Sequence, residues 1–394
     1  MSHRWAALPG WAQALLVWAA SRVWGWAVLT TVGRQQGPGP WGDGALGYLA
    51  FAGTWDSDWY QRIAEEGYPT EVPRDGDGRA LENAWAFYPV FPVLVRTVTA
   101  LTGTSWDATA ATVSLLAGFG AAILVHRLFT RFAPPSTALW GVALVAFGPV
   151  SPVLQVPYAE SLHLLLLAAA LLLVTDGRHL AAAPVVLAMC LTRPAGVPFA
   201  AALGIAWLLR TVHRYRSGRV RRPGDVLDGL LALALFGCAA ALAWPAVAWA
   251  VTGEPTAYTD TETAWRGDDL RLVQPWFGTG VQLFGPVAGL LFPLVLVLAG
   301  TALLRSRPVR EGLGPFVRVW LACYAVYLLL FLHPQTSTFR LLLPLFPLAL
   351  PLAAVSDSRA YRVACLVSGA VLQLVWVGWL WHWKQLPGGG DYPP

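Results

Sequence analysis

Residues 226–251 read VLDGLLALALFGCAAALAWPAVAWAV, and Asp228 is the only charged residue among them. The run is longer than the ~20 apolar residues that an α-helix needs to cross the hydrocarbon core of a bilayer. Residues 210–222, just before it, read RTVHRYRSGRVRR and hold six Arg. Short loops rich in Arg stay on the cytoplasmic side of a membrane. This stretch therefore predicts a membrane-spanning helix that starts from the inner face.

Similar apolar runs recur along the whole chain. Apolar residues make up 56% of the sequence and charged residues 12%, and the mean hydropathy is +0.53. A soluble domain carries about 25% charged residues. The sequence predicts an all-α integral membrane protein, a polytopic helical bundle forming one domain over residues 1–394. We expect about eleven spans, near 11–33, 107–127, 136–151, 159–175, 179–192, 195–210, 226–251, 279–304, 316–332, 338–355 and 361–383.

Residues 87–102 are apolar, but they contain two Pro and one Arg. If they crossed the membrane, the basic loops in the two halves of the chain would demand opposite orientations. We therefore expect a broken helix lying in the membrane interface here. The N-terminus is then inside and the C-terminus outside, with a large outer loop at 34–106 and a second at 253–278. Most acidic residues lie in these two loops.

The basic and cysteine residues exclude other classes of protein. The net charge of +5 comes from Arg, because Lys384 is the only Lys, and no basic block suits a nucleic acid. All four Cys lie inside apolar runs, without the spacing of a metal site. Membrane lipids are the expected surroundings, and no nucleic-acid partner is expected.

The polar motif WDSDWY at residues 55–60 contains two aspartates, and a helical pattern over 56–66 begins within it. Asp56 and Asp58 suit the start of a helix as a cap and a dipole partner. One of them could instead act as a general base. Two positions along an ideal helix are about 200° apart, so the two carboxylates should point to nearly opposite sides. We expect that no metal is required, although an extended chain here would let both hold Mg²⁺ or Mn²⁺.

Further polar residues fall on the same predicted outer face. Glu160 follows Tyr158 at the start of an apolar run, and Arg193 lies between two short ones. Arg340 could bind a phosphate through its planar guanidinium. Each also has a structural interpretation, as a helix-start carboxylate, a snorkelling Arg or an interfacial anchor. The other candidate substrate contacts are Tyr60, His333, Gln335, Trp265 and Arg266.

The motifs WDSDWY, IAEEGY, AFYPVFPVLVR, PYAES, TRPAG and HPQ…FR occur in this order over roughly residues 50–350. In this the chain resembles the GPI mannosyltransferase 2 (PIG-V-like) family of GT-C glycosyltransferases, in a bacterial form. The resemblance matches Asp56 and Asp58 to acidic positions of the first outer loop, Glu160 to a Tyr-x-Glu motif and Arg193 to an Arg-x-x-Gly motif. The chain departs from the family at Ala195, where Asn is expected.

The resemblance implies transfer of mannose from a polyprenyl-phosphate donor to a lipid-linked or glycolipid acceptor. The active site would face the outside of a bacterial plasma membrane. We expect Asp56 to be the general base, with Asp58 secondary, and the configuration of the sugar to be inverted. Arg340, then Arg193 and His333, are the expected ligands of the donor phosphate. Tyr60, Tyr158 and Glu160 would contact substrate.

Two other functions fit a polytopic chain. A transporter or flippase of a lipid-linked sugar would place ionisable residues at the membrane midplane and have two related halves. The predicted charges collect at one face, and the sequence has no internal repeat, so an enzyme is favoured. A structural membrane subunit would bind no ligand.

Overall fold

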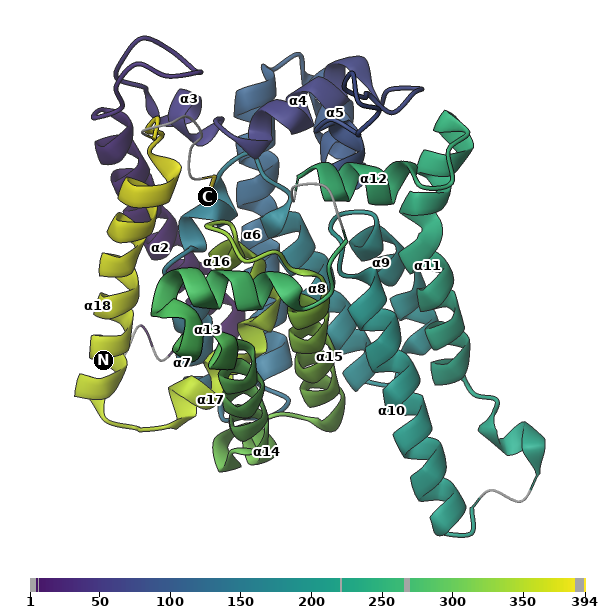
Figure 1. The fold of residues 1–394 in the computed structure, drawn as a ribbon. Helices are drawn as coiled ribbons and strands as arrows, with labels where there is room; N and C mark the ends of the chain where they lie inside the picture. Colours follow the sequence, from purple (N-terminus) through teal and green to yellow (C-terminus); the bar gives the residue numbers. More distant parts are fainter. Residues whose placement is uncertain (1–4, 6, 220–221, 266–269, 387–392) are drawn as a thin grey trace. The chain divides into compact units, whose positions relative to one another are not determined.

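The computed structural model describes residues 5, 7–219, 222–265, 270–386 and 393–394. In these ranges the secondary structure is helical, with two isolated β-bridges and no strand (Figure 1). The fold class is therefore all-α, as predicted. Arg266, one of the predicted substrate contacts, lies outside the described residues. The chain forms two compact units, and the expectation of a single domain stays a prediction.

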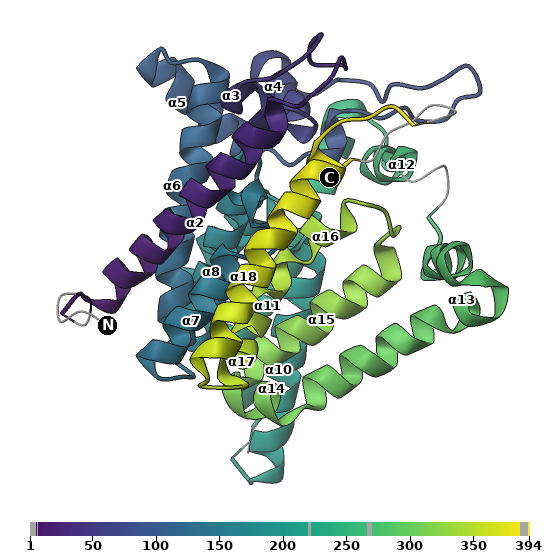
Figure 2. The ribbon, with the colours of Figure 1, turned by 90° about the vertical axis from the view of Figure 1, so that its left-hand side faces the viewer.

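The first unit comprises residues 1–65, 91–168 and 335–394. Its long helices α2 and α18 run alongside each other (Figure 2). Its elements are α2 (Gly10–Gly33), α3 (Tyr48–Ala52), α4 (Asp56–Glu66), α5 (Val90–Thr102), α6 (Trp106–Phe129), α7 (Pro135–Ala146), η2 (Ser151–Gln155), α8 (Glu160–Thr175), α16 (Thr338–Leu341), η4 (Leu343–Leu348), α17 (Ala349–Ala354), α18 (Arg359–Trp376) and η5 (Val377–Trp381); α4, α5 and α8 extend past its limits.

The second unit comprises residues 66–90 and 169–334. Helices α10 and α11 pack side by side in it, and α15 packs on α10 (Figure 1). Its elements are η1 (Ala84–Ala86), α9 (His179–Cys190), α10 (Gly196–Arg216), η3 (Pro223–Val226), α11 (Gly229–Thr252), α12 (Ala257–Ala264), α13 (Gln274–Arg305), α14 (Arg307–Gly312) and α15 (Pro315–Phe331).

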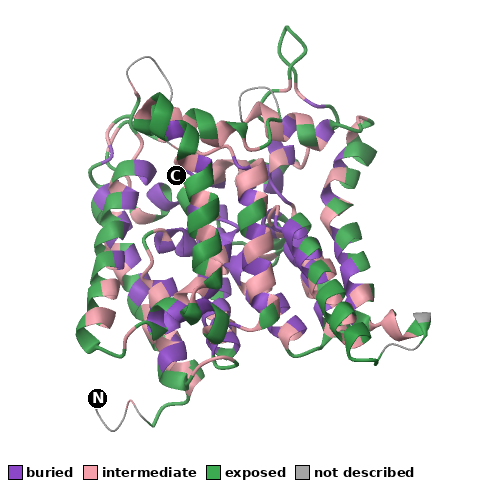
Figure 3. Ribbon diagram, turned by 60° about the horizontal axis from the view of Figure 1, so that its bottom comes forward, coloured by how far each residue is buried: buried purple, intermediate pink, exposed green. Residues whose placement is uncertain are grey.

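Six of these helices are long and apolar enough to cross a membrane: α2, α6, α10, α11, α13, and α18 with η5. Exposed residues recur along the long helices (Figure 3), and many of them are large apolar residues. On α13, for example, Val287, Leu290 and Leu294 are each more than half exposed. A soluble protein rarely exposes such a continuous apolar surface. The chain is therefore a multi-pass membrane protein.

Local sequence explains where the helices begin and end. Residues 87–102, expected to form a helix broken by proline, contain α5, which starts only after Pro89. The run 338–355 is divided into α16, η4 and α17, because three prolines interrupt it. Within α13, Gly285 has a positive φ of 79° and kinks the helix.

A buried arginine that the sequence analysis passed over braces the first unit. Arg22 of α2 donates hydrogen bonds to the carbonyls of Ser151 (2.6 Å) and Ala146 (2.9 Å). Gln373 of α18 donates to the hydroxyl of Ser151 (3.1 Å). An Arg inside a membrane helix is costly unless its donors are satisfied. The hydrogen bonds to Ser151 and Ala146 satisfy the donors of Arg22. They also hold the end of α7 and the start of η2, the segment that leads to Tyr158.

Candidate functional site

Helix α4 begins at Asp56 after a strained residue. Trp55 has a φ of 63°, a conformation that bulky residues rarely adopt. Its indole donates a hydrogen bond to the carbonyl of Trp381 (2.9 Å). The backbone N–H of Asp56 donates to the hydroxyl of Tyr158 (3.0 Å), which in turn donates to the carbonyl of Thr54 (3.4 Å). The start of α4 is thus held by side chains from distant parts of the first unit.

Arg340 of α16 joins two acidic residues at this point. Its Nη1 donates to Oδ2 of Asp56 (2.5 Å) and to Oε1 of Glu160 (3.2 Å). Its guanidinium carbon lies 5.4 Å from the centre of the Tyr158 ring, in a cation–π contact. The side chains of Arg340 and Glu160 are 9% and 5% exposed, so the ion pairs are buried. We call Asp56, Tyr158, Glu160 and Arg340 the arginine cluster.

The guanidinium of Arg340 is only partly used by these contacts. Among the described residues, Nη1 is its only nitrogen that donates a hydrogen bond, and the buried Nε has no partner. A buried polar atom without a partner is rare in proteins. The edge formed by Nε and Nη2 is the planar pair of donors that binds carboxylate and phosphate groups in a bidentate manner. This edge is therefore a candidate site for an oxyanion.

Both Tyr158 and Arg340 stay protonated in the arginine cluster. The guanidinium of Arg340 stays charged, as it does in proteins generally, and the carboxylates of Asp56 and Glu160 stabilise its charge. Burial, followed by the charge of Asp56, raises the pKa of Tyr158 well above its ordinary value. Arg340 is thus a permanent cation, and the Tyr158 hydroxyl remains a donor.

Asp58 lies apart from the arginine cluster, as the helical spacing predicted. Its Oδ2 accepts a hydrogen bond from the indole of Trp41 (2.5 Å). Burial raises the pKa of Asp58, and the nearby Asp107 adds to this, whereas Trp41 and Arg62 lower it. Since Asp56 contacts Arg340 and Asp58 contacts Trp41, the two carboxylates do not share one partner. In the described ranges, no group of three or more His, Cys, Asp or Glu is placed to hold a metal ion.

The remaining predicted residues have different environments. Tyr60 is buried against Phe91, with 5.2 Å between ring centres, and lies 6.4 Å from the ring of Tyr158. It therefore supports the arginine cluster. Gln335 is exposed in the turn before α16, where its backbone N–H donates to the hydroxyl of Thr338.

Three predicted residues belong to the second unit. Arg193 is half-buried between α9 and α10, and His333 is half-buried after α15. Trp265, at the end of α12, packs edge-on against Phe87 with 5.7 Å between ring centres. Their predicted contacts with substrate stay predictions.

Trp381 also contributes to the site, although its sequence context does not indicate this. Its ring lies 5.1 Å from that of Tyr158, and its indole donates to the carbonyl of Phe51 (2.8 Å). The residue lies in the last apolar run, where it resembles any interfacial Trp. The density of Trp in 376–383, WVGWLWHW, is the signal that could have drawn attention to it.

These contacts provide a buried guanidinium with an unused edge beside a carboxylate at the start of a helix. A scan against protein-family models found no match for this chain, and a search of curated proteins found no match either.

Proposed function

We propose that the chain is a mannosyltransferase that uses a polyprenyl-phosphate mannose donor and a lipid-linked or glycolipid acceptor. The observation that carries the proposal is the buried arginine cluster, in which one guanidinium contacts two carboxylates and keeps one edge unused. The motifs shared with the PIG-V-like family supply the sugar and the type of donor. Asp56 comes from the motif WDSDWY, Tyr158 and Glu160 come from PYAES, and Arg340 comes from HPQ…FR.

In the proposed reaction Asp56 takes a proton from a hydroxyl of the acceptor. The hydroxyl oxygen forms a bond to the anomeric carbon of mannose while the bond from that carbon to the phosphate oxygen breaks. The polyprenyl phosphate leaves with the electron pair of the broken bond. Arg340 stabilises its negative charge through Nε and Nη2. Attack opposite the leaving group inverts the configuration at the anomeric carbon.

The ion pair between Arg340 and Asp56 bears on this mechanism. In this proposal a donor phosphate bound at Nε and Nη2 weakens the ion pair between Arg340 and Asp56, and so frees the Asp56 carboxylate for the hydroxyl of the acceptor. Glu160 keeps its own contact and holds Arg340 in place. The order of binding in this proposal is therefore donor first and acceptor second.

We further propose eleven membrane spans, with the N-terminus inside and the arginine cluster at the outer face of a bacterial plasma membrane. The support is that six long helices and six shorter apolar ones are present in the described ranges. Excluding Val90–Thr102, which contains Pro92 and has the predicted interfacial position, leaves eleven. The shorter helices of 10–17 residues would span where the bilayer thins or where neighbouring segments complete them.

The test is reconstitution of the purified chain in vesicles that contain polyprenyl-phosphate mannose labelled in the sugar, together with a bacterial lipid extract. We expect a new labelled lipid, separated from the donor by chromatography. Loss of label from the outer leaflet without a new product would instead identify a transporter. If the label does not change at all, both the transferase and the transporter are refuted, and a structural role remains.

A further inference from the structure

A cavity in the described residues belongs wholly to the second unit. It has a volume of about 190 Å³ and lies among α9, α10, α11, α12 and α15. This is smaller than the roughly 300–1,000 Å³ of pockets that enclose drug-sized ligands. Its size therefore suits one small headgroup. We call it the tyrosine pocket, and its polar lining consists of Tyr88, Tyr258, Thr259, Glu262, Thr263 and Tyr327.

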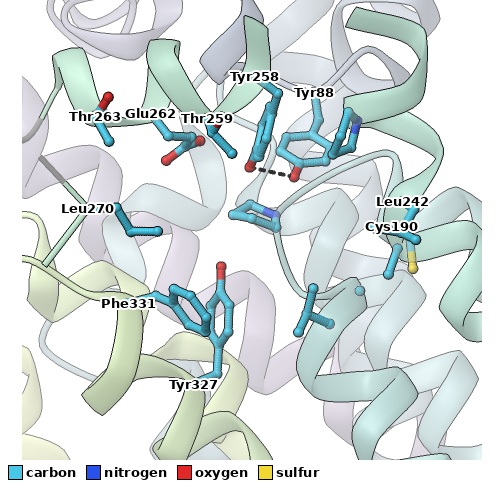
Figure 4. A pocket seen from close by; sticks show the side chains of 15 residues that line it. Tyr88, Cys190, Leu242, Tyr258, Thr259, Glu262, Thr263, Leu270, Tyr327 and Phe331 are labelled. Atoms are coloured by element: carbon cyan, nitrogen blue, oxygen red, sulfur yellow. Dashed lines mark hydrogen bonds between the residues drawn. The ribbon is translucent and has the colours of Figure 1, made fainter. Parts of the chain in front are cut away.

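Polar groups converge on one end of the tyrosine pocket. Tyr258 and Glu262 from α12 and Tyr327 from α15 face the same space (Figure 4). The hydroxyls of Tyr88 and Tyr258 are 2.8 Å apart, so one donates to the other. The second hydroxyl proton of this pair has no further partner among the described residues. Burial, followed by the charge of Glu262, raises the pKa of both tyrosines, so both remain donors.

Glu262 is the only charged residue in the described lining of the tyrosine pocket. Aromatic faces, one carboxylate acceptor and several hydroxyls suit a neutral ring that carries many hydroxyl groups.

An apolar cavity adjoins the tyrosine pocket. That cavity has a volume of about 280 Å³ and lies between α10 and α15. It shares Val197, Tyr327 and Phe331 with the tyrosine pocket. Its other lining residues include Ile205, Val326 and Leu330. Helix α10 is one of the long apolar helices that can span the membrane. A hydrocarbon chain would be sheltered here as it is in a bilayer.

We infer that the tyrosine pocket and the adjoining apolar cavity bind a glycolipid with an uncharged hexosyl headgroup. Glu262 accepts hydrogen bonds from the sugar hydroxyls, and the Tyr88–Tyr258 pair donates one. The hydrocarbon chain lies between α10 and α15. The assignment of this glycolipid as the acceptor rests on the proposed function, whereas its binding does not.

The test measures binding of tritiated octyl glucoside, below its critical micelle concentration, to the full chain in nanodiscs. We expect saturable binding that other octyl hexosides displace. Octyl tetraethylene glycol ether and octylphosphocholine have the same chain but no sugar, and we expect them not to compete. Equal competition by the ether would show that the site binds the alkyl chain without recognising a sugar. Stronger competition by the phosphocholine would show that the site recognises a cationic headgroup. Either result, or no saturable binding by the wild-type chain, overturns the inference.

Two variants locate the site. Glu262→Gln removes the charged acceptor and should weaken binding about tenfold or more. The affinity of the wild type should rise as the alkyl chain of the glucoside is lengthened from hexyl to decyl. Val326→Trp fills the apolar cavity and should remove this gain. Glu71→Gln, an exposed carboxylate of the same unit, is the matched control and should bind as the wild type does. Unchanged binding by both pocket variants, each verified as folded by its gel-filtration profile, would place the site elsewhere.

The two proposals can fail separately. If octyl hexosides bind at the tyrosine pocket but no donor supports transfer, the transferase is refuted and the pocket stands. If mannose is transferred and Glu262→Gln leaves the KM for the acceptor unchanged, the pocket is refuted and the transferase stands. Under both proposals, Glu262→Gln raises the KM for the acceptor and leaves the binding of the donor unaltered.

Discussion

At the scale of single residues, Arg340 has a geometry that a lysine cannot reproduce. One nitrogen contacts both Asp56 and Glu160, while Nε on the other edge has no hydrogen-bond partner in the described residues. A lysine keeps the charge, but its single ammonium group cannot serve both sides. Arg340→Lys should therefore lower the rate of transfer about 10–100-fold, the loss of one charged hydrogen bond. Initial rates in vesicles measure this, with Arg96→Lys on the exposed face of α5 as the control.

A normal rate of transfer for Arg340→Lys, with normal insertion in the membrane, would show that Arg340 is an interfacial anchor and not a phosphate ligand. The role of phosphate ligand would then pass to Arg193 or fail.

The two aspartates at the start of α4 should respond differently to removal of their charge. Asp56→Asn should abolish transfer and retain binding of the donor, because the proposed base is lost and Glu160 still holds Arg340. Asp58→Asn should retain measurable activity, because its amide oxygen can still accept the hydrogen bond from Trp41. The assay is the initial rate of each variant with a chelator and then with added Mn²⁺. If chelation silences the wild type and both variants are equally inactive, a metal shared by the two aspartates is the better explanation.

At the scale of elements, the start of α4 depends on Tyr158, which lies more than 90 residues away in the sequence. Its hydroxyl accepts from the N–H of Asp56 and donates to the carbonyl of Thr54. Tyr158→Phe keeps the buried ring but removes both hydrogen bonds, and should destabilise the fold by about 1–2 kcal/mol. Thermal unfolding in detergent measures this, with the exposed Tyr215→Phe as the control. Equal unfolding temperatures for the two variants would mean that the hydroxyl does not support α4.

At the scale of the whole molecule, the eleven-span arrangement makes a prediction about labelling from outside the cell. In a background without the four native cysteines, Asp77→Cys and Thr259→Cys should react with a membrane-impermeant maleimide. Ser217→Cys should react only after permeabilisation, because it lies beside the Arg-rich segment expected inside. All three positions are exposed, so burial does not decide the outcome. Labelling of Ser217→Cys in intact cells would refute the proposed orientation.

The sequence by itself determined the class of the fold and many helix boundaries. The predicted helix 56–66 has the bounds of α4, and the expected spans 11–33 and 107–127 differ from α2 and α6 by two residues or fewer at either end. Helix formation and burial in a membrane depend on neighbouring residues, on proline and on the length of an apolar run, and all of these are visible in the sequence. The divergence of Asp56 and Asp58 followed from helical spacing alone.

Only the tertiary structure decided which polar residues meet. Arg340 contacts Asp56 across 284 positions and Glu160 across 180, and no local rule relates such distant residues. The brace at Arg22 and the packing of Trp381 on Tyr158 are of the same kind. The tyrosine pocket likewise gathers residues from five helices and three connecting segments, although the sequence of α12 indicates only part of an outer loop. Long-range pairing depends on how the helices pack, and the periodicity of each helix does not contain that information.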